Sequence, residues 1–223
     1  MITRPGCLAM IDISAAQPTI DWGRVAAAGI SVVAVEVGVG NDRPNSCRVA
    51  QVAGARAAGL RVLPYDFAYP LPADGVHPGR DPIAQVALWT AATANLGLDP
   101  AEPLIVDIEW PPTTSWQFWG VNAVSVRGWL LAALSEAERV TGVTPWVYGS
   151  PGFLEAIRTQ DEPELGRFPL WLAEWGVNVP GVPAPWAAWA AWQYSSTGHV
   201  DGIEPVVDLS WIRQSPDATL QPV

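Results

Sequence analysis

The sequence predicts a single α/β domain, an irregular and incomplete β/α barrel whose last strands lack full helices. Strand-like and helix-like segments alternate over the first 160 residues, which is typical of a parallel sheet with right-handed crossovers. After residue 168 the helix-like segments stop, while strand-like segments continue. No internal repeat, Gly/Ser-rich linker or charge run divides the 223 residues, so we expect one domain over residues 1–223.

Five short apolar runs, rich in β-branched residues, predict the strands of the alternating part. Runs of this length and composition fill the middle of a parallel sheet, where both faces are buried. Pro111 and Pro112 stop the fourth run, since proline cannot donate a hydrogen bond to a neighbouring strand. The runs cover residues 7–14, 31–40, 61–69, 102–112 and 144–150.

Helix signals lie between these runs. Thr19 or Asp21 can cap the first helix, Gly29 ends it, and Gly142 ends the long fourth helix. The second helix has small residues on one face and arginines on the other. The predicted helices cover residues 19–29, 47–59, 81–97, 115–142 and 152–160.

The last third of the chain predicts three strands joined by turns. They cover residues 168–175, 187–196 and 204–212. One segment is ambiguous, because Trp186, Trp189 and Trp192 recur every three residues, a period that indicates a helix. The flanking prolines and the polar run QYSSTG that follows favour an extended segment instead.

The composition restricts the classes of partner. A formal net charge of −10 disfavours nucleic acid and anionic membrane surfaces, and no apolar run is long enough to insert into a membrane. Cys7 and Cys47 give neither a disulfide framework nor a metal spacing, so we expect free thiols. With only two histidines, a histidine-based metal site is not expected. Thirteen tryptophans in an acidic chain favour a sugar ligand, because their flat apolar faces can stack on sugar rings.

Carboxylates end most of the predicted strands, and in barrels of this kind the functional residues lie at the carboxyl ends of the strands. For Asp12 and Asp208, capping of the following turn is an equal alternative, and isolated Glu36, Asp66 and Glu174 are more often solvated loop residues. A Ca²⁺ or Mg²⁺ site is a less favoured alternative for such a group of acids. The strand-end acids are Asp12, Glu36, Asp66, Asp107, Glu109, Glu174 and Asp208.

Asp107 and Glu109 are the strongest catalytic candidates. They follow the apolar run at residues 104–106 and lie two positions apart, so on a strand they share a face with Cα atoms roughly 6.5 Å apart. Two neighbouring carboxyls in a cleft push their pKa values apart, so that one stays protonated. A protonated acid beside an ionised one is the pair that hydrolysis of a glycosidic bond requires. The structural alternative is a pair of capped or ion-paired acids.

Several motifs, in order and spacing, resemble glycoside hydrolase family 25, the Chalaropsis-type lysozymes or N-acetylmuramidases. They are MIDISAAQ, PLIVDIEW, TPWVYGS, PLWLAEWGV, PWAAWAAWQYSSTGHVDGI and VVDLS, and the resemblance covers about residues 8–212, leaving 213–223 as a C-terminal tail. It implies a flattened, irregular barrel of eight strands and five helices, with the tryptophan segment as a strand. It also implies hydrolysis of the β-1,4 bond between N-acetylmuramic acid and N-acetylglucosamine in peptidoglycan.

The resemblance also implies roles for single residues. Glu109 falls on the family's catalytic acid/base, Asp107 on its partner carboxylate, and Asp12 and Asp208 on two further active-site aspartates. Positions that line the family's sugar groove are occupied by Tyr65, Phe67, Tyr148, Trp171, Gln193 and Tyr194.

Two residues depart from the family's pattern. Glu36 stands where a lysine is usual, and Asp66 stands where a histidine is usual. Both changes make the cleft more negative, so we expect them to raise the pKa of nearby acids and to shift the activity optimum downward. An altered substrate preference is the alternative outcome.

An active muramidase, as in a phage lysin, is the function that the sequence favours. The alternatives are a wall-binding module without turnover and a virion structural component with the same fold. Three mechanisms stay open: a carboxylate nucleophile, a directly attacking water, and attack by the substrate's own acetamido group, which we favour.

Peptidoglycan is the expected partner, with no cofactor and no metal, and we expect a monomer. No signal peptide is visible at the N-terminus, so we expect release through a holin-type pore or export by another route.

Overall fold

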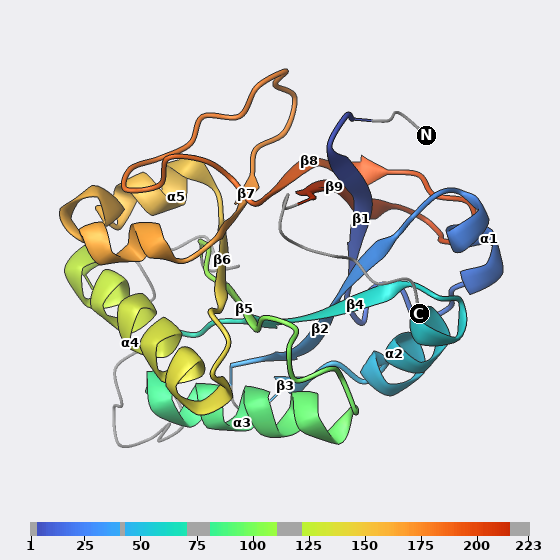
Figure 1. Cartoon of the computed structure of the whole chain (residues 1–223), viewed down its shortest axis with the longest axis horizontal. Helices are drawn as coiled ribbons and strands as arrows, with labels where there is room; N and C mark the ends of the chain where they lie inside the picture. Colours follow the sequence, from blue (N-terminus) through green and yellow to red (C-terminus); the bar gives the residue numbers. More distant parts are fainter. Residues whose placement is uncertain (1–3, 41–42, 71–80, 111–121, 215–223) are drawn as a thin grey trace.

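The apolar runs form a closed ring of eight strands. The computed structural model describes residues 4–40, 43–70, 81–110 and 122–214, and Figure 1 shows the ring at their centre. Around the ring the order is β1-β9-β8-β7-β6-β5-β4-β2, and β1 pairs with β2 to close it. The strands are β1 (Cys7–Ile13), β2 (Val32–Val39), β4 (Arg61–Phe67), β5 (Ile105–Asp107), β6 (Trp146–Gly149), β7 (Leu170–Ala173), β8 (Ala191–Gly198) and β9 (Val207–Arg213).

A short strand outside the ring, β3 (Arg43–Pro44), pairs antiparallel with β2 and was not predicted. Eight ring strands with five α-helices confirm the barrel expected from the sequence, as far as the described residues extend. Within this part of the chain, no helix is long and apolar enough to cross a membrane.

Four of the five α-helices in the described residues begin at a polar side chain that caps the first turn. Asp21, Asp81, Asn122 and Ser150 each accept a backbone N–H of the first turn, so Asp21, not Thr19, caps the first helix. Figure 1 shows the helices around the outside of the ring, with α1 next to the connection between β8 and β9. The helices are α1 (Trp22–Ala27), α2 (Arg48–Ala57), α3 (Pro82–Asn95), α4 (Ala123–Thr141) and α5 (Pro151–Ala156), and two 3₁₀ turns, η2 (Thr159–Asp161) and η3 (Pro163–Arg167), follow α5.

The direction of β9 corrects the prediction of a parallel sheet. β9 runs antiparallel to both of its neighbours, β8 and β1, because only eight residues connect it to β8, too few for a crossover to a parallel strand. Asp208 therefore lies near the amino end of its strand. It is directly paired with Asp12, so the reversed direction still brings it to the active end of the barrel.

Three predicted boundaries were wrong. α4 begins at Ala123, because Asn122 has an extended backbone and acts as its cap; residues 115–121 of the predicted helix lie outside the described part. β5 ends at Asp107, so Glu109 lies beyond the strand. Trp186 and Trp189 precede β8 and lie in an irregular segment, where they are buried by packing.

Two kinds of core hold the ring in shape. Inside the barrel, side chains from alternate positions form one cluster that includes Met10, Ala34, Tyr65, Ile105 and Trp171. Outside it, two clusters pack the sheet against the helices.

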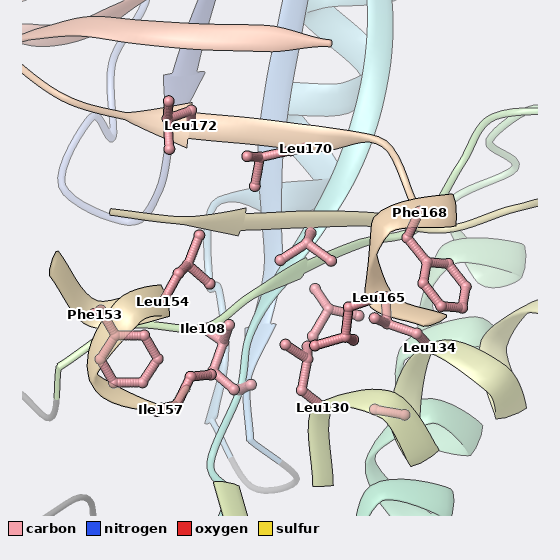
Figure 2. Packing of buried hydrophobic residues seen from close by; sticks show 14 of the residues in the cluster. Ile108, Leu130, Leu134, Phe153, Leu154, Ile157, Leu165, Phe168, Leu170 and Leu172 are labelled. Atoms are coloured by element: carbon pink, nitrogen blue, oxygen red, sulfur yellow. The ribbon is translucent and has the colours of Figure 1, made fainter. Parts of the chain in front are cut away.

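Figure 2 shows part of the larger outer cluster, where Leu170 and Leu172 of β7 and Ile108 meet residues of α4 and α5, among them Leu130 and Leu154. Ile108 points outward into this cluster, so Asp107 and Glu109 on either side of it face the barrel interior.

Candidate active site

Five of the seven predicted strand-end acids line one small cavity at the carboxyl end of the barrel. Its volume is about 150 Å³, and none of its ten lining residues is basic. Side chains from seven ring strands, and from the segments that follow two of them, converge there. Asp12, Tyr65 and Asp107, for example, lie within the last three residues of their strands. The lining residues are Asp12, Ser14, Glu36, Tyr65, Phe67, Asp107, Glu109, Tyr148, Trp171 and Asp208.

Asp107 and Glu109 form a carboxyl pair. Both side chains line the small cavity, and each shifts the pKa of the other, so one of the two carboxyl groups stays protonated. Burial raises the pKa of Asp107 well above its usual range, and the Glu109 charge raises it further. Burial also raises the pKa of Glu109. One oxygen of Asp107, Oδ1, is buried without a hydrogen-bond partner among the described residues.

Asp12 and Asp208 form a second pair across β1 and β9. Burial and the Asp208 charge raise the pKa of Asp12 well above its usual range, and burial raises the pKa of Asp208. Gln193 lies behind the pair, and its Nε2 donates to both oxygens of Asp12 at 3.2 and 3.1 Å and to Asp208 at 3.2 Å. The Gln193 hydrogen bond opposes the rise in the pKa of Asp12.

Aromatic rings form the rest of the wall. Tyr148 packs edge-on against Trp171 with 4.7 Å between ring centroids, and Tyr65 packs on the same indole at 6.4 Å. The Trp171 indole N–H donates to Ser210 Oγ at 3.1 Å, which fixes the ring. The cavity is therefore a rigid acidic pocket with apolar sides.

A second, larger cavity adjoins the first. Its volume is about 420 Å³, and Glu109 and Tyr148 line both cavities, so they stand at the boundary. The other lining residues are Trp110, Ser150, Pro151, Gly152, Ala173, Glu174 and Trp175.

Three predicted groove residues do not line either cavity. Gln193 is buried beneath the acids. Tyr194, its neighbour on β8, lies on the outer face of the barrel, where it stacks on Trp211 at 5.2 Å. Asp66 alternates with Tyr65 and Phe67, which face the small cavity, and so it points to the other side of the sheet, where it is fully buried.

Sequence reasoning missed several residues of the two cavities. Ser14, Trp110, Ser150 and Trp175 were not chosen, and Glu174 was assigned to a solvated loop. Each follows the carboxyl end of a ring strand within three residues. Polar and aromatic residues just after the carboxyl ends of the strands therefore indicate this site as well as acids do.

Asp66 gives a prediction about stability. Neither of its carboxylate oxygens has a hydrogen-bond partner in the described part of the chain. Burial, and then the Glu36 charge, raise its pKa well above the usual range, against the opposing effects of the Gly38 amide and Arg48. In the unfolded chain Asp66 ionises near pH 4, whereas in the folded protein it keeps its proton to higher pH. Its contribution to the free energy of unfolding therefore falls as pH rises above about 4.

We expect Asp66→Asn to raise the free energy of unfolding at pH 7.5 by at least about 1 kcal/mol and to change it little at pH 4. Urea unfolding of both proteins at the two pH values measures this. Asp201→Asn is the matched control, since Asp201 is exposed and pairs with Arg24 at the surface, and we expect it to cost less than ~1 kcal/mol. An Asp66→Asn protein less stable than the wild type at pH 7.5 would contradict the account.

Metal binding has no support in the described residues, where no three His, Cys, Asp or Glu side chains are grouped so that they could hold a metal ion. A barrel that gathers paired carboxyl groups and aromatic walls at the carboxyl end of its strands has the arrangement of a glycoside hydrolase. The fold and the site together define that class of protein.

Comparison with known proteins gives the family. The profile of glycosyl hydrolases family 25 matches residues 11–203, and the chain belongs to this family. Lysozyme M1 of Streptomyces globisporus is 26% identical over 198 residues, which cover 89% of this chain and 65% of that protein, so this chain spans less than two thirds of that relative. N,O-diacetylmuramidase of Chalaropsis sp. is 26% identical over 188 residues, covering 82% of this chain and 86% of that protein.

A solved structure agrees with the barrel. The bacterial lysozyme from Streptomyces coelicolor superposes with a TM-score of 0.80 at 24% identity, over 96% of this chain and 95% of that one. At this level of identity the likeness concerns the fold.

Proposed function

We propose that this protein is a peptidoglycan hydrolase that cleaves the β-1,4 bond between N-acetylmuramic acid and N-acetylglucosamine. One observation carries the proposal: Glu109 lines both cavities and shares the small one with Asp107, which does not line the large one. A glycosidic oxygen that bridges rings in the two cavities would lie beside Glu109. The names of the two relatives, a lysozyme and a diacetylmuramidase, support the same chemistry.

The carboxyl groups of the small cavity support one placement of the two sugar rings. Positive charge develops at the anomeric carbon as the bond breaks, and Asp12, Asp107 and Asp208 all line the small cavity. We therefore place the ring that carries the anomeric carbon in the small cavity, where the ionised member of a carboxyl pair would stabilise it. We place the leaving ring beyond Glu109. As general acid, Glu109 gives a proton to the leaving oxygen, and as general base it later removes a proton from the attacking water.

Asp107 supports attack by the acetamido group of the substrate. Asp107 lines the small cavity, and a carboxylate there can accept the acetamido N–H of the bound ring. A carboxylate in this position orients the acetamido oxygen toward the anomeric carbon and stabilises the cyclic cation that forms. The resulting ring intermediate is opened by water that Glu109 activates, so no bond to the protein is formed.

Glu36 bears on the pH dependence of this reaction. Burial raises the pKa of Glu36 to about 7, with Arg43 opposing the shift, and its charge raises the pKa of Asp107. Each limb of a bell-shaped profile follows the pKa of one essential group, so raised pKa values move the profile to higher pH. The raised pKa values thus favour an upward shift of the pH optimum of activity, opposite to the downward shift expected from the sequence.

We expect Glu36→Gln to leave activity unchanged below about pH 6, where Glu36 is already neutral, and to lower it by roughly two- to tenfold at pH 8. Without the Glu36 charge, the proton shared by Asp107 and Glu109 is lost at lower pH. Initial rates on purified peptidoglycan from pH 4 to 9 measure the effect, with exposed Glu204→Gln as control. Identical alkaline limbs for wild type and Glu36→Gln would refute this role of Glu36.

Release of reducing sugar from purified peptidoglycan tests the function itself. We expect steady release by the wild-type protein. Binding to the wall with no release would instead support a wall-binding module.

A further inference from the structure

We propose that Glu36 is a specificity-determining residue, which makes the small cavity select muramic acid rings whose lactyl group is joined to a peptide over rings with a free lactyl carboxylate. This inference rests on the proposed function, because it concerns the ring that we place in the small cavity. It goes further by naming the chemical form of that ring which the cavity accepts. Glu36 is one of the five acids that line this cavity, and it belongs to β2.

Glu36 lies across the barrel from the large cavity. The residues of the large cavity belong to β5, β6 and β7 or follow them, whereas Glu36 is on β2. In the closed ring, β2 stands between β4 and β1, and β1 is the strand opposite β6. A substituent that points away from the leaving ring therefore points toward the wall that carries Glu36 and Asp12.

The backbone of β2 directs Glu36 into the cavity. Val32 and Ala34 point into the barrel interior, and Glu36 continues that face two residues further on. The pairing of β2 with β4 shifts between Glu36 and Gly38, an irregularity of the kind that re-aims side chains next to active sites. Buried Asn45 donates from Nδ2 to the Glu36 carbonyl at 2.9 Å, so this part of the strand is held in place.

The direction of the lactyl group follows from the proposed placement of the ring. The anomeric carbon, C1, lies beside Glu109, and the acetamido group on C2 lies beside Asp107 of β5. The lactyl group is attached to C3, the next ring carbon, so it points onward from β5 on the side away from C1. The next strands in that direction are β4 and β2, which bring Tyr65 and Glu36 to the cavity wall. In this placement the lactyl group is directed toward Glu36.

Within the described residues, nothing positive lines the small cavity. Five of its ten lining residues are acids, and none is basic. The charge of Arg43 acts on Glu36, but Arg43 does not line the cavity, and its guanidinium lies over the Tyr69 ring at 5.0 Å from the centroid. A free lactyl carboxylate would therefore lose water and lie beside like charge, which weakens binding.

A lactyl group joined to a peptide has the opposite properties. Its carboxyl group is an amide, which carries no charge, and the amide N–H can donate to the Glu36 carboxylate. A hydrogen bond to an ionised acceptor is stronger than one between neutral groups. Glu36 thus attracts one form of the ring and repels the other, and both contributions increase specificity.

The protonation state of Glu36 provides a way to vary this selection. Burial raises the pKa of Glu36 to about 7, with Arg43 opposing the shift, so Glu36 is mostly neutral at pH 5.5 and mostly ionised at pH 8. A lactyl carboxylate is ionised at both pH values. All other charged groups are kept in Glu36→Gln, so its comparison with the wild type isolates Glu36. The charged or titratable groups nearby are Asp12 of β1, Arg43 of β3, Tyr65 and Asp66 of β4, Asp107 of β5 and Asp208 of β9.

Soluble glycan strands with and without their peptides test the proposal. Both come from the same purified peptidoglycan, and an amidase that cuts the bond between lactyl group and peptide gives the bare strands. At pH 8 we expect the wild-type kcat/KM to be roughly tenfold or more higher for peptide-bearing strands than for bare strands. We expect this ratio to fall by about threefold or more in Glu36→Gln. In Glu204→Gln, an exposed residue outside both cavities, it should keep the wild-type value. At pH 5.5 the three proteins should give the same ratio.

A binding measurement separates selection from turnover. Calorimetric titration of Glu109→Gln protein with the two kinds of strand, with and without Glu36→Gln, should show the same preference at pH 8 and the same loss of it. Equal ratios in wild type and Glu36→Gln at pH 8, or bare strands hydrolysed as well as peptide-bearing ones, would overturn selection by Glu36 and leave the proposed function standing. If the wild type releases no reducing sugar from either strand, the proposed function fails, and the titration alone decides whether Glu36 selects peptide-bearing strands.

Discussion

Replacement of Glu109 by glutamine should lower kcat on peptidoglycan by ~10²–10⁴-fold, the usual contribution of a positioned general acid. Glutamine keeps the size and the hydrogen-bonding ability of Glu109 but has no proton to give to the leaving oxygen. The same change removes a buried acid whose pKa is raised by burial, so the variant should unfold at higher urea concentration at neutral pH. Reducing-sugar release and urea unfolding of the same preparation measure both effects.

Glu174→Gln is the matched control for this change. Glu174 lines the large cavity at the same end of the barrel, but it does not line the small cavity that holds the other acids. Glutamine can still accept the Gly181 N–H, so we expect less than a tenfold loss of activity. Equal losses in the two variants, or a Glu109→Gln protein with near wild-type kcat, would rule out Glu109 as the acid.

Replacement of Asp107 by asparagine should lower kcat by ~10²–10³-fold. Asparagine can still contact an acetamido group, but it cannot stabilise the positive charge that forms when this group attacks. It also removes the carboxyl partner of Glu109, so the pH profile should lose the limb that the pair produces. Initial rates from pH 4 to 9 measure both changes.

An experiment on the wild-type protein distinguishes the two possible roles of Asp107, which are to stabilise the attacking acetamido group or to act as the nucleophile. Mass spectrometry of the intact protein, quenched during turnover, should show no covalently bound sugar. A sugar adduct mapped to Asp107 would contradict substrate assistance and assign this residue as the nucleophile.

The barrel was largely predictable because its strands are short apolar runs and its helices carry clear caps. The antiparallel direction of β9 was not, because an apolar run carries no information about direction, and only the short connection from β8 reveals it. The start of α4 was misplaced because the apolar pattern extends before Asn122, and the cap decides the boundary. The extended segment favoured for the tryptophan run was right only from Ala191 on, because Trp186 and Trp189 are buried from the irregular segment before β8.

The acids of the site were predictable, because Asp12, Asp107 and Asp208 interrupt apolar strands where a carboxylate is costly. The large cavity was not, since Trp110 and Trp175 look like other tryptophans until the fold brings them beside Glu109. Nor did the sequence separate inward from outward positions on β8, where Gln193 supports the acids and Tyr194 faces the outer cluster. Side-chain direction near irregular strands depends on local register, which β8 shifts between residues 193 and 195.

The identity of the new reducing ends tests the central claim most directly. Purified peptidoglycan is digested with the wild-type protein, the new ends are reduced with borohydride, and the reduced sugars are identified by mass spectrometry. If the anomeric ring lies beside Asp12, Asp107 and Asp208 and the leaving ring lies beyond Glu109, the reduced sugar is that of N-acetylmuramic acid. Reduced N-acetylglucosamine, or no new reducing end at all, would contradict the account.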